Sequence, residues 1–520
     1  MEKNHCQEPV QLIQAPSLWS LLESRADLSP KAVFLIQGET DRVITFGECR
    51  RQALDLAAWL YSQGIGPGTV VAWQLPTRIE SVLLQFALAR LGAIQAPVIH
   101  LYGEKELAQV LTQAGADFVI VPPGDEEHRT RAQLAVASLP ETAVPPRILA
   151  LETGGGESQL PPFAEPGEAV HWYYFTSGTT SRPKGARHTD QTLMAGARYL
   201  GTALEVRAVD VGTIGYPIGH IGGIIYSAMA IMAGIPVVLI ERYVPARVAA
   251  AFRRHRVTLG GGSTAHYQML LAEQARVGNE PLIPSLEILA GGGAAKPADL
   301  FGEVRNRLDA TIVHAYGMTE APISAHNSRY GTDEQLTHSD GIPMPGLEVR
   351  IVDGQGRVLA TGESGEILLR GPNVCKGYLD PEQTAAAFDE EGFLHTGDVG
   401  HLREDGHLCV TGRIKDIIIR KGENISAREI EESLLDHPKV GDVAVIGLPD
   451  PERGEMVCAV VEPVDINDPL TFGEMLDHLS ARKLMRQKIP ERLENLERLP
   501  RNEGLQKVVK TRLRDRFMAG

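Results

Sequence analysis

The chain has 520 residues, of which 43% are hydrophobic and 22% are charged, so it can bury the cores of about two to four domains. It carries 51 Lys and Arg against 66 Asp and Glu, and the formal charge of −15 excludes an overall positive field that would gather nucleic acid. Five widely spaced cysteines without a CxxC pair predict neither a disulfide framework nor a zinc site. They favour a reducing compartment, which we expect to be the cytoplasm, and the N-terminal residues lack the apolar core of a signal peptide.

The first third of the chain alternates strands with helices. Residues 32–36 and 69–75 are short apolar runs typical of buried strands, and residues 81–94 have a helical pattern. This βαβ rhythm predicts a parallel sheet covered by helices.

The segment 211–240 contains no Asp, Glu, Lys or Arg and is long enough to cross a bilayer. Six glycines, two prolines and His220 interrupt it, and no basic cluster flanks it. We therefore interpret it as a buried strand, turn and helix, and we expect no transmembrane segment.

A second α/β pattern follows, with strands predicted at 237–240, 257–262, 286–293 and 310–317. Several of these strands end directly in glycines. Ligands of open α/β sheets bind at the carboxyl ends of strands, where the backbone must come close, so we expect a binding site at this edge.

From about residue 341 the sequence pattern changes to short strands and turns, which predict a small antiparallel unit. After residues 412–416 a compact segment of helices and strands follows. The predicted fold class is α/β, with a large N-terminal domain (1–413) of two doubly wound α/β subdomains and a small β subdomain. A small α+β C-terminal domain (414–520) completes the chain, with the boundary near Lys415.

A loop dense in hydroxyl groups and glycine occupies residues 173–185, YYFTSGTTSRPKG. Its hydroxyls, the glycines Gly178 and Gly185 and the charge of Lys184 could hold a phosphate, and an apolar strand precedes it. The Walker pattern GxxxxGK[ST] is absent, and a polar turn would have the same composition. Composition alone therefore leaves both interpretations open.

The order of residues in this loop resembles the signature YTSGTTGxPKG of the adenylate-forming enzymes, which include acyl-CoA synthetases, adenylation domains and luciferases. Ser181 stands where glycine is frequent in that family. Three further stretches resemble family motifs, namely AYGMTE (315–320), HTGD (395–398) and GRIKDIIIRKGENISAREIE (412–431). The C-terminal domain of these enzymes is mobile, and the resemblance implies the same here.

The resemblance implies a role for each matching residue. Tyr316 packs by the adenine, Thr319 contacts phosphate and Glu320 holds Mg²⁺. Asp398 takes both ribose hydroxyls, Arg413 contacts ribose or phosphate, and Lys415 is the hinge. The implied nucleotide-binding residues are Thr176, Ser177, Gly178, Thr179, Thr180, Lys184, Gly292, Gly293, Ala294, Tyr316, Gly317, Thr319, Asp398 and Arg413, and the implied catalytic residues are Lys507, Lys184, Thr319 and Glu320.

Three stretches, YPIGHIGG (216–223), GGSTAHYQM (261–269) and AGGGAA (290–295), are expected to wall the acyl pocket. The pocket residues implied are His220, Gly222, Gly261, Gly262, His266, Gly291 and Met318. A carboxylate that would pair an amino-acid substrate is missing near His220, which favours an uncharged acyl group, and the glycines suggest space for a bulky or branched chain. His220 is interpreted as a gate to the thiol passage, or alternatively as a packed or capping histidine. The branch-level resemblance is to cyclohexanecarboxylate- and medium-chain-acyl-CoA synthetases.

The C-terminal lysine of these enzymes, typically in PxxxxGK, has a shifted counterpart in LPRNEGLQKVVKTRLR (499–514). Counting from Pro500 places Gln506 at the expected position. Aligning on the following helix instead makes Lys507 the equivalent, because turns absorb insertions readily. Lys510 is the weaker candidate.

The implied activity is a two-step ligation that uses ATP, Mg²⁺ and CoA. A carboxylic acid is activated as acyl-AMP with release of pyrophosphate, and the acyl group then passes to the thiol of CoA. Two alternatives stay open, namely loading of the phosphopantetheine of an acyl carrier protein and a non-catalytic relative that binds acyl groups or nucleotides. No nucleic-acid partner is expected, and the sequence is compatible with an oligomer.

Overall fold

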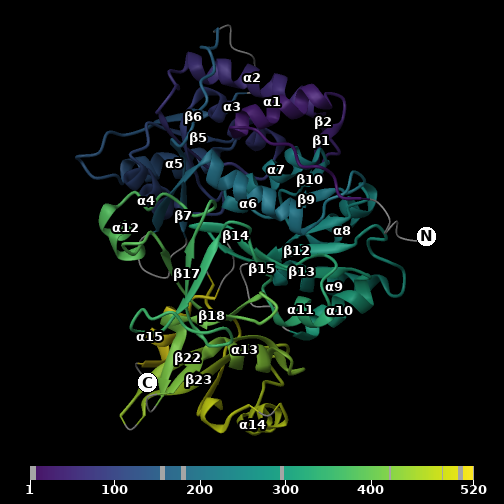
Figure 1. The fold of residues 1–520 in the computed structure, drawn as a ribbon, viewed down its shortest axis with the longest axis vertical. Helices are drawn as coiled ribbons and strands as arrows, with labels where there is room; N and C mark the ends of the chain where they lie inside the picture. Colours follow the sequence, from purple (N-terminus) through teal and green to yellow (C-terminus); the bar gives the residue numbers. More distant parts are fainter. Residues whose placement is uncertain are drawn as a thin grey trace.

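The computed structural model describes residues 8–152, 159–176, 183–292, 298–420, 423–451, 453–482, 484–501 and 508–518. Its elements form five sheets, and Figure 1 shows the N-terminal elements at one end of the molecule and the C-terminal sheet at the other. The first sheet has six strands in the order β6-β5-β3-β4-β7-β8. These strands are β3 (Val70–Trp73), β4 (Ile94–Pro97), β5 (Phe118–Val121), β6 (Arg147–Ala150), β7 (Val170–Thr176) and β8 (Lys184–Thr189).

Two further sheets continue the α/β part. The order β2-β1-β10-β9 joins β1 (Val33–Gln37), β2 (Val43–Thr45), β9 (Gly212–Ile214) and β10 (Val237–Leu239). The order β11-β12-β13-β14-β15 joins β11 (Leu259–Gly262), β12 (Ile288–Gly292), β13 (Thr311–Met318), β14 (Ala321–His326) and β15 (Ile342–Pro343). Strands β11, β12 and β13 are parallel, so their glycine-rich carboxyl ends meet at one edge, as the sequence predicts.

Helices cover these sheets, which confirms the predicted α/β class (Figure 1). They are α1 (Leu18–Leu28), α2 (Phe46–Ser62), α3 (Ile79–Leu91), α4 (Glu104–Ala114), α5 (Glu126–Ala137), α6 (Asp190–Ala203), α7 (Ile221–Ala233), α8 (Pro245–Arg254), α9 (Thr264–Val277), α10 (Ala298–Leu308) and α11 (Asp333–His338). The largest apolar cluster packs α1, α2, α3, α6 and α7 against the first two sheets, and Trp19, Trp73 and Trp172 are fully buried in it.

The charge-free segment 211–240 folds as β9, α7 and β10 inside this cluster, which confirms the predicted strand, turn and helix. The helix α7 ends at Gly234, whose φ of 76° is in the left-handed region that glycine favours. The buried guanidinium of Arg25 donates to the carbonyls of Ile231 and Met232 at 2.8 Å each and so satisfies the last turn. Among the described residues, no helix is long and apolar enough to span a membrane.

The predicted small antiparallel unit is the sheet β16-β17-β18-β19. It consists of β16 (Glu348–Val352), β17 (Gly365–Arg370), β18 (Leu394–Leu402) and β19 (Leu408–Arg413), with α12 (Pro381–Ala387) inserted before β18. The motif HTGD lies within β18, where the φ of Gly397 is 68°.

The last sheet has the order β21-β20-β23-β22, with β24 paired to β23. Its strands are β20 (Ile417–Arg420), β21 (Glu423–Ser426), β22 (Val440–Asp450), β23 (Gly454–Pro463) and β24 (Arg492–Asn495). Its helices are α13 (Ala427–Leu435), α14 (Phe472–Ala481) and α15 (Lys510–Met518). Two apolar clusters made entirely of residues after 417 lie between these strands and helices.

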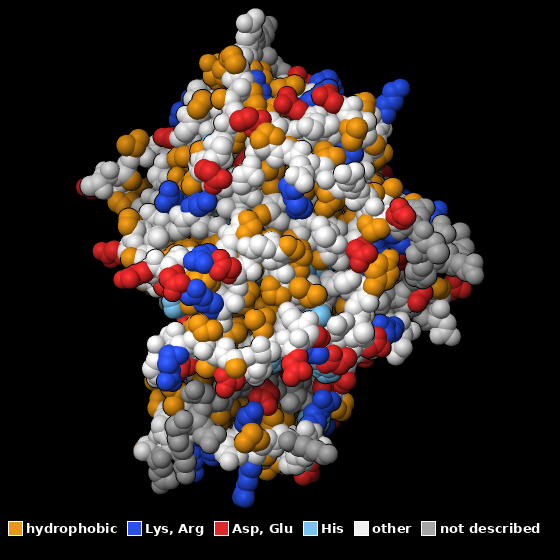
Figure 2. All heavy atoms as spheres, in the orientation of Figure 1, with side chains coloured by type: hydrophobic (Ala, Val, Ile, Leu, Met, Phe, Trp, Pro, Cys, Tyr) orange, Lys and Arg blue, Asp and Glu red, His pale blue; other side chains and the backbone are white. Residues whose placement is uncertain are grey.

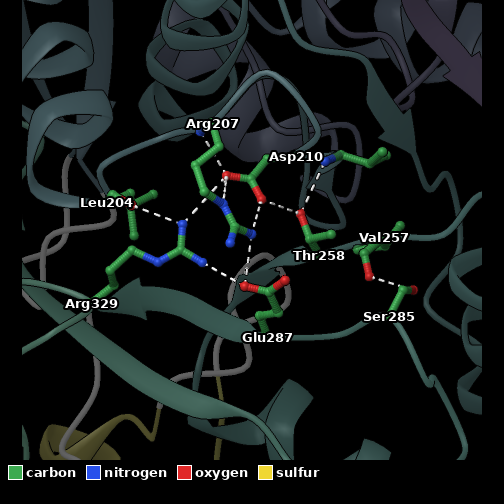
Figure 3. A network of polar contacts seen from close by, with 9 residues as sticks. Leu204, Arg207, Asp210, Val257, Thr258, Ser285, Glu287 and Arg329 are labelled. Atoms are coloured by element: carbon green, nitrogen blue, oxygen red, sulfur yellow. Dashed lines mark hydrogen bonds and ion pairs between the residues drawn. The ribbon is translucent and has the colours of Figure 1, made fainter. Parts of the chain in front are cut away.

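A network of buried charges joins the amino ends of β9, β11 and β12 (Figure 3). Asp210 is fully buried and accepts from the Arg207 guanidinium at 2.7 Å and from the Thr258 hydroxyl at 2.9 Å. Glu287 accepts from Arg207 and from Arg329 at 2.7 Å each. On the surface, by contrast, acidic and basic side chains are interspersed over the face that Figure 2 shows.

Candidate active site

The strands β7 and β8 bring together the two ends of the hydroxyl-rich loop. They pair antiparallel, and Thr176 is in register with Lys184. The predicted loop residues Ser177, Gly178, Thr179 and Thr180 lie outside the described residues. The loop therefore begins and ends at one point, at the carboxyl end of β7.

A buried tyrosine stands between Lys184 and Glu320. The ammonium of Lys184 lies 5.2 Å from the centre of the Tyr378 ring, and the Tyr378 hydroxyl donates to Glu320 Oε1 at 2.6 Å. Glu320 is 5% exposed. Burial raises the pKa of Glu320, while the hydrogen bond from Tyr378 and the charge of Lys184 oppose that rise. The first and second predicted motifs thus meet in one place.

Glu320 is a buried carboxylate that could serve as a ligand of Mg²⁺. Mg²⁺ is usually held by one or two carboxylates together with substrate phosphates and waters. The described residues contain no cluster of three or more metal-ligating side chains, so a full protein cage is absent from them. One buried carboxylate next to a lysine that can bind phosphate fits a metal that arrives with the nucleotide.

Tyr316, Asp398 and Arg413 form a second polar cluster, contributed by β13, β18 and β19. The Tyr316 hydroxyl donates to Asp398 Oδ2 at 2.8 Å, and Arg413 Nε donates to Asp398 Oδ1 at 2.7 Å. Burial and the adjacent Asp398 carboxylate raise the pKa of Tyr316, so its hydroxyl stays protonated and remains a donor. Each carboxylate oxygen keeps a further lone pair, so Asp398 can still accept from a vicinal diol.

Thr319 is anchored through its backbone. His188 Nε2 donates to the carbonyl of Thr319 at 2.8 Å, and His188 Nδ1 lies 2.9 Å from the Thr192 hydroxyl. Burial lowers the pKa of His188 to about 4, so this histidine is neutral. At Gly317 a Cβ atom would lie 2.6 Å from the Ile323 nitrogen, so glycine is required for the close turn between β13 and β14.

The glycines expected to wall the acyl pocket lie at the carboxyl ends of β11 and β12. A Cβ on Gly291 would lie 1.7 Å from the carbonyl oxygen of Gly262, and one on Gly292 would lie 2.1 Å from the carbonyl oxygen of Ala315. A Cβ on Gly261 would lie 3.0 Å from the carbonyl oxygen of Thr213. These glycines therefore allow backbones to approach one another, which is a different reason from the open space that the sequence suggested.

Aromatic side chains surround these glycines. Tyr216 packs edge-on against Tyr226 at 5.8 Å, and Tyr243 packs edge-on against His266 at 4.4 Å. The Nδ1 of His266 accepts from the backbone N–H of Ser263 at 3.0 Å, and burial lowers its pKa to about 4. Met318 is half-buried at the end of the neighbouring strand β13. The walls described here are neutral and largely aromatic.

His220 caps the N-terminus of α7. Its Nδ1 accepts from the backbone N–H of Gly222 at 3.1 Å, and its ring packs edge-on against Tyr216 at 6.2 Å. A Cβ on Gly222 would lie 3.0 Å from the Tyr216 ring. His220 also lines a narrow pocket together with Phe175 and Thr319. The capping interpretation that the sequence left open therefore describes this histidine, and a role at the passage is compatible with it.

The predicted hinge and the C-terminal tail are only partly described. Lys415 lies in a short 3₁₀ turn, Ile414–Asp416, and its carbonyl accepts from the Arg514 guanidinium at 3.3 and 3.4 Å. Burial and the nearby Arg413 lower the pKa of Lys415. Lys510 is ion-paired with Glu431 at 2.7 Å. The predicted residues Gly293, Ala294 and Lys507, together with Gln506, lie outside the described residues.

Sequence reasoning missed two residues of the site, Tyr378 and His188. Both act on residues far away in the chain, since Tyr378 reaches Glu320 over 58 positions and His188 reaches Thr319 over 131. No local sequence pattern distinguishes these two residues from an ordinary tyrosine in a turn or an ordinary histidine in a strand. Their contacts with Glu320 and Thr319 are found only in the folded structure.

Comparisons with known proteins agree with this geometry. Residues 22–379 match the model of the AMP-binding enzyme family, and residues 429–504 match that of the AMP-binding enzyme C-terminal domain. The medium-chain fatty-acid–CoA ligase of Escherichia coli is 31% identical over 476 residues, 88% of this chain and 83% of the relative. The feruloyl-CoA synthase of an Amycolatopsis species is 33% identical over 495 residues, 95% of this chain and 97% of the relative.

Among solved structures, the o-succinylbenzoate CoA synthetase of Bacillus subtilis, in complex with its acyl-adenylate intermediate, has a TM-score of 0.84 at 28% identity and covers 96% of this chain and 98% of its own. The ATP-bound MatB of Rhodopseudomonas palustris has a TM-score of 0.85 at 27% identity and covers 96% and 99%. The matched family models, together with these relatives, show that the chain belongs to the AMP-binding enzyme family of adenylate-forming enzymes.

Proposed function

We propose that the protein is an acyl-CoA synthetase, an ATP-dependent acid–thiol ligase. The observation that carries this is the convergence of four motifs far apart in the sequence. The Arg413 guanidinium pairs with Asp398, and its charge opposes the rise that burial causes in the pKa of Glu320. Glu320 in turn meets Lys184 through Tyr378. Adenylate formation needs groups for phosphate, metal and ribose in one cleft, and this set supplies them.

The reaction proceeds in two steps, namely adenylation of the acid and transfer of the acyl group to the thiol. A carboxylate oxygen of the acid attacks the α-phosphorus of ATP, a new O–P bond forms, and the bond to pyrophosphate breaks. The thiol sulfur then attacks the acyl carbonyl, AMP leaves, and the thiol proton passes to solvent. No protein nucleophile is required, because in-line displacement at phosphorus depends mainly on positioning and on charge neutralisation.

Residues of this chain divide those tasks. Lys184 neutralises phosphate charge, Glu320 holds the metal, and Asp398 accepts from the ribose diol while Tyr316 and Arg413 orient its carboxylate. Bound Mg²⁺ supplies charge neutralisation on the phosphate oxygens. Gly292, Gly317 and Thr319 bring backbone close to the nucleotide, and Lys507 supplies the C-terminal cation for the adenylation step.

The acid is proposed to carry an uncharged acyl group. The described walls around His266 and Gly262 are aromatic rings and backbone, and the neutral His266 presents no charge to an acid. The relatives named above are described as ligases for medium-chain fatty acid and ferulate. Medium-chain, alicyclic and aromatic acids are therefore the classes to test, with CoA as the thiol.

The C-terminal domain is proposed to begin near Lys415 and to rotate about it between the two steps. Separate apolar clusters on the two sides of residue 415 support a boundary there. Rotation would exchange the face that carries Lys507 for the β21 region, changing a site for adenylation into one for thiol attack.

A carrier-protein thiol is the second candidate, favoured by one relative. The salicyl-AMP ligase / salicyl-S-ArCP synthetase of Mycobacterium tuberculosis is 32% identical over 485 residues, 88% of this chain and 82% of the relative. The phosphopantetheine arm is common to CoA and to carrier proteins, so the narrow pocket beside His220 does not discriminate between them. Turnover with CoA and with a holo carrier protein, measured side by side, distinguishes the two.

The deciding experiment is acid-dependent exchange of pyrophosphate into ATP across a panel of medium-chain, alicyclic and aromatic acids. Exchange with at least one acid, followed by thioester formation with CoA, is the expected result. Binding of ATP without exchange for any acid would favour a non-catalytic relative and would overturn the ligase assignment.

A further inference from the structure

Tyr378 contacts both the ammonium of Lys184 and the carboxylate of Glu320 in the proposed nucleotide site. Its hydroxyl donates to Glu320 Oε1 at 2.6 Å, while the ammonium of Lys184 rests over its ring, 5.2 Å from the centre. Tyr378 is buried, with 5% of its surface exposed, and it belongs to the same apolar cluster as Tyr316. One side chain thus contacts both charges.

The backbone around Tyr378 fixes this position. It forms an antiparallel bridge with Ala186, and the Leu379 N–H donates to the carbonyl of Gly185 at 2.9 Å, next to Lys184. On the other side, the Cys375 N–H donates to the carbonyl of Glu320 at 2.8 Å. The segment 375–379 therefore ties the strand that carries Lys184 to the turn that carries Glu320.

The contact with Tyr378 has a consequence for the two charges. Opposite charges that meet in a buried site pair strongly, and such a pair has to be broken before either group can bind something else. In the part of the chain that the structure describes, Lys184 makes no ion pair with Glu320. The ammonium instead has a cation–π contact, and the carboxylate has a neutral donor.

We propose that Tyr378 is a positioning residue that keeps Lys184 and Glu320 apart, so that each charge stays available for one ligand. The hydroxyl orients Glu320 toward Mg²⁺, and the ring holds Lys184 at the end of the phosphate loop. This inference rests on the proposed ATP-dependent function. It assigns separable roles to the two halves of one side chain.

Two variants separate those halves. Tyr378→Phe removes the hydroxyl and keeps the ring, whereas Tyr378→Leu removes both. Tyr199→Phe is the matched control, because Tyr199 lies in the same apolar cluster and its hydroxyl donates to the backbone carbonyl of Ile342, away from Glu320. ATP binding to each full-length variant is measured by calorimetry over a series of Mg²⁺ concentrations, with thermal unfolding recorded in parallel.

For Tyr378→Phe we expect the Mg²⁺ concentration for half-maximal ATP binding to rise about tenfold, as for loss of one hydrogen bond to a charged group, with ATP affinity unchanged at saturating Mg²⁺. For Tyr378→Leu we expect the same change in Mg²⁺ dependence and, in addition, a threefold to tenfold fall in ATP affinity at saturating Mg²⁺, roughly the range of a partly buried cation–π contact. Tyr199→Phe should match the wild type in both measurements.

The outcomes keep this inference separate from the proposed function. If the wild-type protein binds no Mg·ATP, the proposed function fails. If the wild type binds Mg·ATP and Tyr378→Phe has the same Mg²⁺ dependence as Tyr199→Phe, the role of Tyr378 is overturned while the function stands. Tyr378→Phe could also lose ATP binding only because part of the protein unfolds. If the folded fraction then has the Mg²⁺ dependence of the wild type, Tyr378 has a structural role only, and the proposal is overturned.

Discussion

Buried charges are arranged differently at the amino ends and at the carboxyl ends of the strands. At the amino ends of β9, β11 and β12, Arg207 pairs directly with Asp210 and with Glu287 at 2.7 Å each. Near the carboxyl ends of β7 and β13, Lys184 and Glu320 contact the two sides of Tyr378 instead of each other. Figure 3 shows the first arrangement, in which the carboxylates of Asp210 and Glu287 point toward the guanidinium of Arg207.

The difference separates charges that hold the fold from charges that we propose to bind a ligand. In the network of Arg207, Asp210, Glu287 and Arg329, each group satisfies another, so removing one leaves a buried charge uncompensated. Lys184 and Glu320, by contrast, both contact the neutral Tyr378, so their electrostatic interaction with a ligand remains available. Substitutions at the two ends of the strands should therefore affect different measurements.

Asp210→Ala should produce the largest effect, and it should be an effect on stability. The substitution removes one of the two carboxylates that lie 2.7 Å from the Arg207 guanidinium and leaves two buried arginines with Glu287 alone, which we expect to lower the free energy of unfolding by about 3–5 kcal/mol. Denaturant unfolding measures this. The control is Glu391→Ala, which removes a surface partner of Arg350 and should leave the free energy of unfolding almost unchanged, because a solvent-exposed ion pair contributes little.

If Asp210→Ala unfolded like the control variant, the amino-end network would not be a stabilising element. A loss of ATP affinity in the folded variant, beyond that of the control, would contradict the separation of the amino-end charges from the carboxyl-end charges.

Glu320→Gln should affect activity without a comparable loss of stability. It keeps the shape of the side chain and its acceptor for Tyr378 but removes the charge expected to hold Mg²⁺. We expect pyrophosphate exchange to fall by about a hundredfold to a thousandfold, the usual cost of one electrostatic contact to a transition state. The free energy of unfolding should change by less than about 1 kcal/mol, because the buried carboxylate is replaced by a neutral group.

If Glu320→Gln and Asp210→Ala lost similar amounts of stability, the charges at the carboxyl ends would stabilise the fold as much as those at the amino ends, which would contradict the comparison. Lys184→Met, assayed in parallel, should lower exchange by a similar factor if both charges act on the same phosphates.

The two tail lysines extend the comparison to the C-terminal sheet. Lys510 is paired with Glu431, so Lys510→Ala should mainly reduce stability, by about 1–3 kcal/mol as a buried charge loses its partner. Lys507→Ala should leave the unfolding transition in place and lower pyrophosphate exchange by about a hundredfold, because it removes the cation proposed to act in adenylation. Loss of exchange in the Lys510 variant alone, in folded protein, would show that Lys510 is the functional lysine.

A buried neutral histidine gives the smallest effect, a dependence of stability on pH. Burial lowers the pKa of His188 to about 4, whereas an unfolded histidine titrates near about 6.5. Between these values the unfolded chain binds more protons, so stability is complete above about pH 6.5 and declines as the pH falls toward 4. Denaturant unfolding of His188→Gln at pH 7.5, 6 and 5 should show a shallower decline.

His326, whose pKa burial also lowers to about 4, should account for part of the decline that remains. The control is His338→Gln, which changes an exposed histidine. An equal slope in His188→Gln and in the wild type would show that His188 binds protons alike in the folded and unfolded states, which would contradict a lowered pKa.

Much of the architecture was predictable because it depends on neighbouring residues. The apolar runs at 32–36 and 69–75 became β1 and β3, and the charge-free segment 211–240 became β9, α7 and β10. Hydrophobic periodicity and turn residues act within one element, so they can be read in order along the chain. The motif around Lys184 was recognisable for the same reason, since its residues are consecutive.

What a side chain does in the assembled site depended on contacts that the linear order does not contain. Tyr378 reaches Glu320 and Lys184, His188 supports the carbonyl of Thr319, and Gly291 faces a carbonyl oxygen of the next strand. By itself the sequence determined which elements form, which motifs are present and so which family the chain belongs to. Only the tertiary structure decided which charges are paired and which are kept apart, because that depends on distances between groups from different strands.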